Sequence, residues 1–319
     1  MKILVTGGAG FIGSHICEAL LKRGDEVICV DNFDNYYDPK IKRENVKKLK
    51  IEPKFTLIES DIKDKEAMGN IFNKYKIDKV IHLAAKVGVR PSIEDPLSYM
   101  ENNIIGTLNI LEQSKKHNVK YFILGSSSSV YGDRLKCPFS EKDEAKPISP
   151  YAASKKSCEE LCFTYHSLHN LKVCCLRFFT VYGPRGRPDM AIANFTRLID
   201  QDKPIPVYGD GNSKRDYTYI ADIVKGVLSA TDAEFNFEII NLGSNNPIQL
   251  TKLISLIGKN LGKQPKIENL PEQQGDVPFT FADISKANKL LGYQPSVSIE
   301  EGIKNFVLWY KNNKKAFLQ

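Results

Sequence analysis

A glycine-rich loop near the start of the chain is the feature that most limits how this sequence can fold. The apolar run Lys2–Thr6 leads directly into Gly7-Gly8-Ala9-Gly10-Phe11-Ile12-Gly13, and a helical pattern follows. In such a unit Gly7 permits a tight turn, Gly10 lets a pyrophosphate approach the backbone, and Gly13 lets helix and strand pack closely. The N–H groups and dipole at the helix start favour the anion. We therefore expect a dinucleotide-binding loop, although its GxxGxxG spacing departs from the usual GxGxxG.

An acidic residue downstream of this loop narrows the choice of dinucleotide. Asp31 comes 18 residues after Gly13, at the end of the expected strand Glu26–Val30. A carboxylate at that place can accept hydrogen bonds from the ribose hydroxyls, and it would repel a 2′-phosphate. The sequence therefore favours NAD over NADP. The alternative interpretation of the loop is a glycine turn that binds no ligand.

The rest of the chain alternates between apolar runs and helical patterns. Buried strands are expected at Lys2–Thr6, Glu26–Val30, Phe55–Glu59, Val80–Ala84, Tyr121–Gly125, Val173–Phe178 and Glu238–Leu242. Helices are expected at Ser14–Arg23, Lys65–Lys74, Asn103–His117, Tyr151–His169, Ala191–Asp200 and Leu250–Asn260. This alternation indicates βαβ units, a parallel sheet and right-handed crossovers.

A loop rich in glycine and proline at Gly183–Pro188 separates two regions. Strands and helices alternate regularly before it, and helices are mixed with short strands after it. The length of 319 residues is enough for about two domains. We expect an α/β fold, a Rossmann-type parallel sheet with a smaller, interleaved C-terminal α/β substrate domain. The NAD-binding domain would comprise residues 1–180 with roughly 218–246, and the substrate domain residues 181–217 with 247–319.

Composition and charge exclude several classes of function. The net charge is +7, but lysines and arginines are scattered, so we expect an anionic metabolite rather than nucleic acid as the partner. The seven cysteines form no CxxC pair, which is typical of reduced thiols in a cytoplasmic protein and predicts no metal site. Glycines interrupt the apolar N-terminus, which argues against a signal peptide. No apolar stretch reaches the roughly 18 residues of a membrane-spanning helix.

A tyrosine and a lysine four residues apart suggest acid–base chemistry. If the expected helix forms, Tyr151 and Lys155 share one face. An ammonium near a phenol favours the phenolate and lowers the pKa of the tyrosine, and a positively charged nicotinamide would add to this effect. Tyr151 is thus a candidate general base. The spacing alone also occurs by chance on helix surfaces.

A run of serines supplies possible partners for this tyrosine. The segment Gly125–Gly132 contains Ser126 to Ser129 and follows an apolar strand, so its hydroxyls belong at the carboxyl end of that strand. Ligands bind at that edge in open α/β sheets. A polar turn that satisfies its own backbone is the alternative. Together with the glycine loop, however, the serines and the Tyr151–Lys155 pair predict one active site.

These motifs resemble the extended short-chain dehydrogenase/reductase family, and within it the nucleotide-sugar epimerases. The segments concerned are the glycine loop, Asp61-Ile62, His82–Ala85, Asn102 and Arg215–Tyr217. The resemblance implies a catalytic triad of Ser127, Tyr151 and Lys155. It also implies the following cofactor-binding residues: Gly7, Gly10, Phe11, Ile12, Gly13, Asp31, Asn32, Asp61, Ile62, Leu83, Ala84, Ala85, Asn102, Tyr151, Lys155 and Phe178.

Longer segments resemble the UDP-glucuronate 4-epimerases in particular. They are Asn32–Pro39, Arg177–Ala191, Gly275–Pro278 and Ala282–Lys286. UDP-glucose 4-epimerases usually carry asparagine where this chain has Thr180. The related 4,6-dehydratases place an Asp-Glu pair in the segment that here contains only serines. This sequence departs from the UDP-glucuronate 4-epimerases at Lys86, where glutamine is more usual, and at Arg185, which is often tryptophan.

The resemblance implies C4 epimerisation of UDP-glucuronate to UDP-galacturonate through a 4-keto sugar, with tightly bound NAD recycled in each turnover. Implied substrate-binding residues are Ser128, Ser129, Thr180, Arg187, Tyr208, Arg215 and Asp276. Arg187 would pair with the uronate carboxylate, with a solvated loop arginine as the alternative. Arg215 would meet the diphosphate. Tyr208 would stack on uracil, with a core aromatic as the alternative.

Other functions remain open on this scaffold. The nearest alternatives are a UDP-glucose/UDP-galactose 4-epimerase and a UDP-glucuronate decarboxylase. Their products differ from the UDP-galacturonate that a UDP-glucuronate 4-epimerase makes. A non-catalytic NAD-sensing module is a more distant alternative, which the intact Ser127, Tyr151 and Lys155 argue against. The family commonly dimerises through the helix that carries the tyrosine and lysine, so the resemblance also implies a homodimer.

Overall fold

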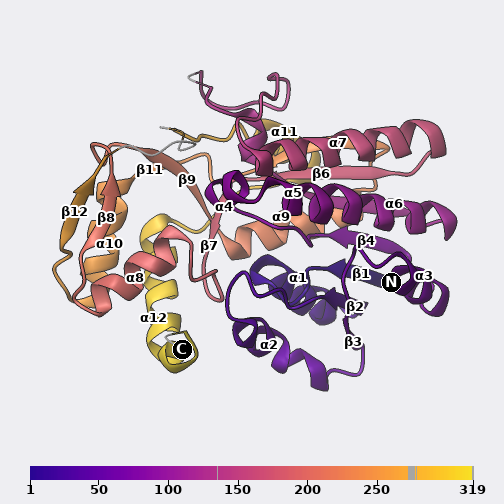
Figure 1. Ribbon diagram of the computed structural model, residues 1–319, viewed down its shortest axis with the longest axis horizontal. Coiled ribbons are helices and arrows are strands. Elements are labelled where there is room, and N and C mark those ends of the chain that lie inside the picture. The colour runs from indigo at the N-terminus through magenta and orange to yellow at the C-terminus, as the bar shows by residue number, and fades with distance from the viewer. Residues whose placement is uncertain (135, 272–276, 278, 318–319) are drawn as a thin grey trace.

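A seven-stranded parallel sheet lies at the centre of the computed structural model, which describes residues 1–134, 136–271, 277 and 279–317. Its strands are β1 (Lys2–Thr6), β2 (Glu26–Asp31), β3 (Phe55–Glu59), β4 (Lys79–His82), β5 (Tyr121–Ser127), β6 (Val173–Phe178) and β10 (Phe237–Leu242). They lie in the order β10-β6-β5-β4-β1-β2-β3 (Figure 1). The strand order reverses between β1 and β4, and ligands bind beside such a switch point in doubly wound sheets. The expected Rossmann-type sheet is confirmed.

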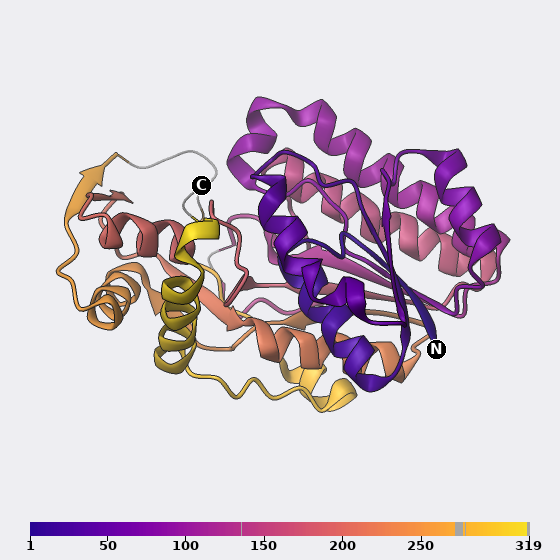
Figure 2. The ribbon, with the colours of Figure 1, turned by 90° about the horizontal axis from the view of Figure 1, so that it is seen from below.

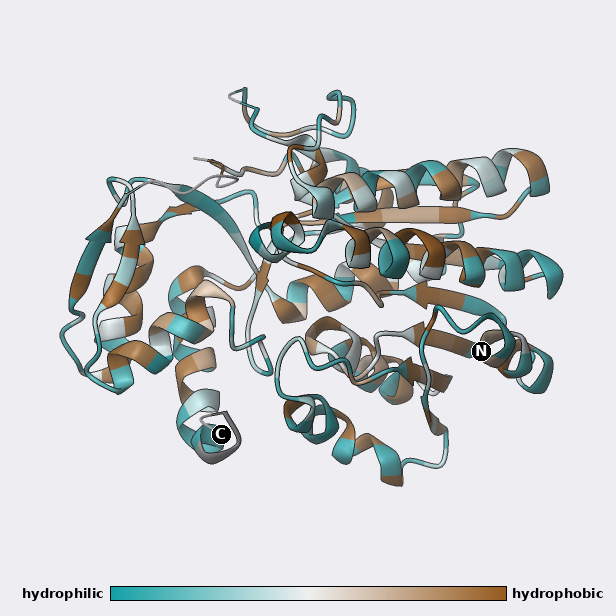
Figure 3. Cartoon of the chain, in the orientation of Figure 1, coloured by the Kyte–Doolittle hydropathy of each residue, from teal (hydrophilic) through white to brown (hydrophobic). Residues whose placement is uncertain are grey.

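Helices cover both faces of this sheet. On one face lie α1 (Phe11–Arg23), α9 (Ile220–Ala233) and α11 (Ser285–Leu291); on the other lie α3 (Lys65–Lys74), α6 (Gly106–Lys116) and α7 (Pro150–His169). Figure 2 shows the strands running between these two layers, and Figure 3 shows their apolar composition. Because both faces of the sheet are covered, its strands are continuous apolar runs rather than alternating patterns. That is why short apolar runs in the sequence identified them.

A smaller lobe is built from the C-terminal part of the chain (left in Figure 1). Its helices are α8 (Ala191–Asp200), α10 (Leu250–Leu261) and α12 (Ile299–Phe317). Its strands are β7 (Thr180–Tyr182), β8 (Ile205–Tyr208), β9 (Lys214–Tyr219), β11 (Pro247–Gln249) and β12 (Ile267–Leu270). These strands form a three-stranded sheet, β11-β9-β7, and a two-stranded sheet, β12-β8. Strand β10 returns to the large sheet beside β6, as expected. The two-domain boundaries given above remain a proposal.

Short elements complete the described part of the chain. They are α2 (Pro39–Lys47), α4 (Val89–Glu94), α5 (Pro96–Tyr99), 3-10 turns at Leu49–Ile51 and Ser128–Tyr131, and a π-helical turn at Met100–Ile105. Within the described ranges, no helix has the length and apolar character needed to cross a membrane. The described residues also contain no cluster of three or more histidine, cysteine or acidic side chains suited to a metal ion.

Several expected element boundaries were wrong by up to three residues: α1 begins at Phe11 rather than Ser14, and β5 ends at Ser127 rather than Gly125. The strand expected to run to Ala84 ends at His82, because the chain beyond it passes close over the glycine loop. A Cβ on Gly7 would lie only 2.7 Å from the backbone nitrogen of Ala84. The helix expected from Asn103 is regular only from Gly106, since a π-helical turn precedes it. Such turns occur often at functional sites, and the Asn103 side chain here bonds the backbone of Lys86 at 2.7 and 2.9 Å.

Candidate active site

A cavity of about 770 Å³ opens at the carboxyl edge of the large sheet and extends to the smaller lobe. Its wall includes Ser127, Tyr151 and Lys155, together with every predicted cofactor residue except Asp61. The predicted substrate residues Ser128, Ser129, Thr180, Arg187 and Arg215 line the same cavity, whereas Tyr208 does not. Asp276 lies outside the described residues. Folding thus brings together residues that lie far apart in the sequence.

The glycine loop forms a cradle that side chains would fill. Gly7 has φ +68°, a conformation that glycine adopts without strain. A Cβ on Gly13 would lie 2.2 Å from the carbonyl oxygen of Gly7, which is a backbone atom, so the loop itself would have to shift. Helix α1 begins after Gly10 with no side chain capping its first N–H groups. These features fit the pyrophosphate of a dinucleotide at the helix N-terminus.

Asp31 has a structural role that the sequence did not reveal. Its two carboxylate oxygens accept hydrogen bonds from the N–H groups of Ala9, at 3.1 Å, and of Phe33, at 2.9 Å. Burial raises the pKa of Asp31, and the charge of Lys42 opposes that rise. Asp31 therefore ties the glycine loop to the segment that follows β2. Each oxygen has a second lone pair, so a ribose contact remains a prediction.

Asp61 lies behind the cavity wall and reaches it through another residue. Its Oδ2 accepts a hydrogen bond from the side-chain amide of Asn32 at 3.1 Å, and its Oδ1 accepts one from the N–H of Lys63 at 2.8 Å. Asn32 and Ile62 line the cavity. We therefore expect Asp61 to orient Asn32, and its predicted contact with adenine remains a prediction.

The catalytic candidates meet at the start of helix α7. Ser149 caps this helix by accepting a hydrogen bond from the N–H of Ala152 at 3.2 Å, which sets the first turn that carries Tyr151. The Ser127 hydroxyl lies near the Tyr151 phenol and opposes the rise that burial causes in the pKa of that tyrosine. Lys155, one turn further on, donates to the carbonyl oxygen of Gly125 at 2.7 Å. The tyrosine, serine and lysine therefore form one group at the end of β5.

The expected pKa of Tyr151 needs a correction. Burial raises the pKa of Tyr151, and the Ser127 hydrogen bond and the charge of Arg187 only partly offset that rise. Lys155 is directed at a carbonyl oxygen, and burial lowers the pKa of its own ammonium. The spacing of the tyrosine and lysine correctly places them on one face, but it says nothing about desolvation, which is the larger effect here.

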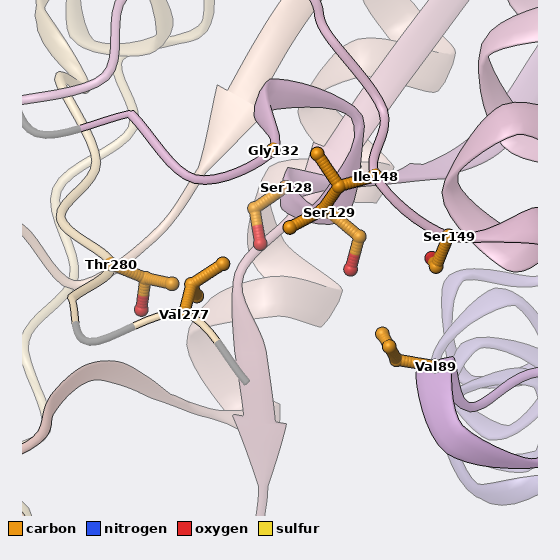
Figure 4. A pocket seen from close by; sticks show the side chains of 8 residues that line it. All are labelled: Val89, Ser128, Ser129, Gly132, Ile148, Ser149, Val277 and Thr280. Atoms are coloured by element: carbon orange, nitrogen blue, oxygen red, sulfur yellow. The ribbon is translucent and has the colours of Figure 1, made fainter. Parts of the chain in front are cut away.

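The remaining serines line the part of the cavity next to Ser127. Ser127 donates a hydrogen bond to the Ser129 hydroxyl at 3.1 Å and accepts one from the Ser129 N–H at 3.2 Å. Figure 4 shows the hydroxyls of Ser128 and Ser129 directed into an adjoining pocket of about 50 Å³, opposite Val89 and Thr280. Several hydroxyl donors therefore converge where a sugar substituent could bind.

Arg187 is held by two residues that sequence reasoning left without a role. Its guanidinium forms a two-pronged ion pair with Asp189, with Nε 3.0 Å from Oδ1 and Nη2 bonded to Oδ2. The guanidinium carbon also lies 5.2 Å from the ring centre of Tyr36. Asp189 and Tyr36 both line the cavity. Both lie in segments that carry the family resemblance, Asn32–Pro39 and Arg177–Ala191. That resemblance could therefore have identified them.

Tyr208 and Arg215 have different surroundings. Tyr208 ends strand β8 outside the cavity wall, and the guanidinium carbon of Arg90 lies 4.9 Å from its ring centre. Stacking of Tyr208 on uracil therefore remains a prediction. Arg215 lines the cavity beside Tyr217, and its contact with a diphosphate remains a prediction. Arg90 also lines the cavity and is a cation that the sequence did not single out.

Arg185 and Lys86, the two departures from the family pattern, lie in different places relative to the cavity. Arg185 is paired with Glu18 of helix α1, with Nη2 2.6 Å from Oε2, and is not part of the cavity wall. The arginine thus links the loop after β7 to the large domain. Lys86 lines the cavity, and its Nζ lies 3.9 Å from a carboxylate oxygen of Asp95.

A buried ion pair lies behind the serine run. Arg177 of β6 donates to both carboxylate oxygens of Glu159 in α7, at 2.9 and 2.8 Å, and the hydroxyl of Ser126 donates to the same carboxylate at 2.6 Å. Arg177 and Glu159 are 2% and 1% exposed. The pair therefore joins the helix that carries Tyr151 to the two strands that end at the cavity.

We expect Glu159→Gln to lower the free energy of unfolding by about 3–5 kcal/mol, because it leaves Arg177 buried without its counter-charge. Urea unfolding measures this loss. The matched control is Glu160→Gln, since Glu160 is the next residue, is 63% exposed and pairs with Lys156. That variant should lose less than about 1 kcal/mol. Equal losses in the two variants would contradict a special role for the buried pair.

Comparisons with known proteins agree with this geometry. The model of the GDP-mannose 4,6-dehydratase family matches residues 4–306. A UDP-glucuronate 4-epimerase from Thermodesulfobacterium geofontis is 46% identical over 97% of this chain and 96% of the relative. The crystal structure of UDP-glucuronic acid 4-epimerase from Bacillus cereus, in complex with UDP-glucuronic acid and NAD, has a TM-score of 0.93 and 40% identity, covering 98% of this chain and 99% of that one. UDP-glucose 4-epimerase from Thermotoga maritima, with UDP-glucose, has a TM-score of 0.90 and 36% identity, covering 98% and 100%.

Proposed function

This chain belongs to the GDP-mannose 4,6-dehydratase family of extended short-chain dehydrogenases/reductases, and we propose that it is an NAD-dependent UDP-sugar 4-epimerase acting on UDP-glucuronate. The observation that carries the proposal is the shared cavity. It combines a dinucleotide cradle, the Ser127–Tyr151–Lys155 group, and the Ser128, Ser129, Thr180 and Arg187 side chains. Relatives named UDP-glucuronate 4-epimerase match nearly the whole chain.

The three catalytic residues have separate tasks in this mechanism. When bound, NAD supplies the acceptor and donor of hydride for C4 of the sugar. Tyr151 takes the proton of the C4 hydroxyl as general base and returns it after the sugar has turned. Ser127, which ends β5 in the same cavity wall, donates a hydrogen bond to the same oxygen. Lys155 is anchored on Gly125 and fixes the helix face that presents the tyrosine. Turning the 4-keto sugar about its bond to the diphosphate exposes its other face.

A uronate substrate requires one additional safeguard. Its C6 carboxylate is β to the C4 ketone, so carbon dioxide is lost readily when the C5–C6 bond aligns with the carbonyl π system. We propose that Ser128, Ser129, Thr180 and Arg187 hold the carboxylate out of that alignment. Hydroxyl donors and a guanidinium suit a carboxylate. Dehydration would instead require an acid and a base beside the sugar, and the serine run provides only hydroxyls.

A homodimer in the cytoplasm is part of the same proposal. Helix α7 carries Phe163 and Leu168, which are 51% and 68% exposed, and covering such side chains with a second copy of the chain would stabilise a dimer. The net charge of +7 is compatible with polyanionic nucleotide sugars.

Product analysis tests the proposed function. We expect purified protein, with no NAD added, to convert UDP-glucuronate into UDP-galacturonate, and to act on UDP-glucose and UDP-N-acetylglucosamine more slowly. The reason is that bound NAD is regenerated in each turnover and that Ser128, Ser129, Thr180 and Arg187 together offer hydrogen-bond donors that suit a carboxylate. Chromatography with mass spectrometry identifies the products. A UDP-pentose as the main product would instead indicate a decarboxylase, and faster turnover of UDP-glucose a neutral-sugar epimerase.

A further inference from the structure

We infer that Asp189 is a positioning residue that fixes the Arg187 guanidinium against the substrate carboxylate and thereby keeps UDP-glucuronate from being decarboxylated. This inference rests on the proposed function and assigns a new role within that site. Asp189 lies in the loop between β7 and α8, and its side chain is 37% exposed, so its role is not that of a core residue.

Three contacts determine the orientation of the guanidinium. Nε and Nη2 of Arg187 both donate to Asp189. The guanidinium carbon lies over the ring of Tyr36, 5.2 Å from the ring centre. The Tyr36 hydroxyl in turn donates to Asp189 Oδ2 at 3.5 Å. Because a bidentate pair fixes the plane of a guanidinium and the ring of Tyr36 limits its movement, Arg187 is held in one orientation.

This arrangement leaves a defined edge of Arg187 for the substrate. Asp189 occupies the edge formed by Nε and Nη2, so a second carboxylate can be met only by the hydrogens that point away from it. Asp189 is itself negatively charged and repels a substrate carboxylate from that occupied edge. The Arg187–Asp189 pair therefore carries almost no net charge. It orients the substrate carboxylate more than it strengthens substrate binding. A free arginine would attract the carboxylate more strongly but would allow it several orientations.

Orientation matters because of the chemistry of the 4-keto intermediate. When the C5–C6 bond aligns with the ketone, it breaks and carbon dioxide leaves. The electron pair of that bond moves to C5 and forms an enolate with the C4 carbonyl, and a proton from solvent then adds at C5. The product is a UDP-4-ketopentose, and the two electrons removed earlier from C4 stay on the nicotinamide until they return to the ketone to give a UDP-pentose. A carboxylate held at one angle avoids this sequence.

The variant Asp189→Asn tests the inference, because it keeps the shape of the side chain and removes its charge. We expect the ratio of decarboxylated products to UDP-galacturonate to rise about tenfold or more, since small misplacements at a reacting centre have large effects. The KM for UDP-glucuronate should not rise, because a negative charge has been removed from the site. Asp189→Glu keeps the charge and should return the ratio toward that of the wild type. Anion-exchange chromatography quantifies the products.

Controls separate this inference from its premises. Asp232→Asn removes another aspartate that pairs with an arginine, Arg23 at 2.9 Å, away from the cavity, and should leave the ratio unchanged. If Asp189→Asn only slows turnover at an unchanged product ratio, Asp189 has no positioning role, while the proposed function stands. If the wild type makes no UDP-galacturonate, the proposed function fails, and the inference fails with it.

Discussion

Replacing Tyr151 with phenylalanine should lower the rate of epimerisation about a thousandfold while NAD remains bound. The phenol is the group that exchanges a proton with the C4 hydroxyl, and a positioned general base contributes about 10²- to 10⁴-fold to a rate. Phenylalanine preserves the ring and its edge-to-face contact with Tyr99, whose ring centre lies 6.3 Å away. The loss should therefore appear in kcat rather than in KM. Initial rates with UDP-glucuronate measure it, and NAD released by denaturation measures cofactor content.

A control is needed for the removal of a hydroxyl as such. Tyr75→Phe makes the same change at the end of helix α3, outside the cavity wall, and should keep wild-type activity. A Tyr151→Phe variant with full activity would show that another group acts as the base, and the mechanism would have to be abandoned. Loss of NAD together with activity would instead indicate that the tyrosine serves to hold the cofactor.

The second large effect, a loss of affinity for NAD, is expected for Gly13→Ala. The added Cβ would lie 2.2 Å from the carbonyl oxygen of Gly7 and 2.7 Å from the Cα of Gly8, so the loop itself must shift. Overpacking of this kind costs about 1–3 kcal/mol. If this strain is present mainly in the NAD-bound protein, the affinity for NAD drops about tenfold to a hundredfold. Titration of the NAD-free protein and the NAD content of the purified variant both measure this change.

Gly69→Ala is the matched control for this glycine. Gly69 also lies inside a helix, α3, but the nearest atom to its added Cβ would be Gln113 Nε2 at 3.7 Å, an ordinary contact. Alanine there should retain NAD and stabilise the helix by as much as about 1 kcal/mol. If Gly13→Ala keeps wild-type NAD content, the cradle is not the pyrophosphate site.

The candidate site was predictable to the extent that its residues stand in local patterns. Gly7, Gly13, Tyr151 and Lys155 were found because a strand–loop–helix unit and a helical spacing of four are visible in a short window. The sheet was found because its strands are apolar runs buried on both faces. The strand end at His82 was missed because a close approach to the glycine loop, and not local propensity, stops it.

Contacts between distant segments could not be derived in the same way. Asp31 binds the N–H of Ala9, 22 positions earlier, and Tyr36 lies against Arg187 from another part of the chain. The acid that pairs with Arg187 stands only two residues away from it, but nothing in the spacing shows that their side chains meet. Such contacts depend on where whole elements are placed, and therefore on the packed structure.

The sequence by itself determined the doubly wound sheet, the dinucleotide loop and the identity of the catalytic candidates, because short-range sterics and hydrophobic periodicity are local properties. The tertiary structure alone decided the pKa and partners of those candidates. Burial raises the pKa of Tyr151 although a lysine lies one turn away on the same helix, and that lysine is directed at Gly125. Desolvation and electrostatic pairing are set by every group that packs around a side chain, and those groups come from segments far apart in the chain.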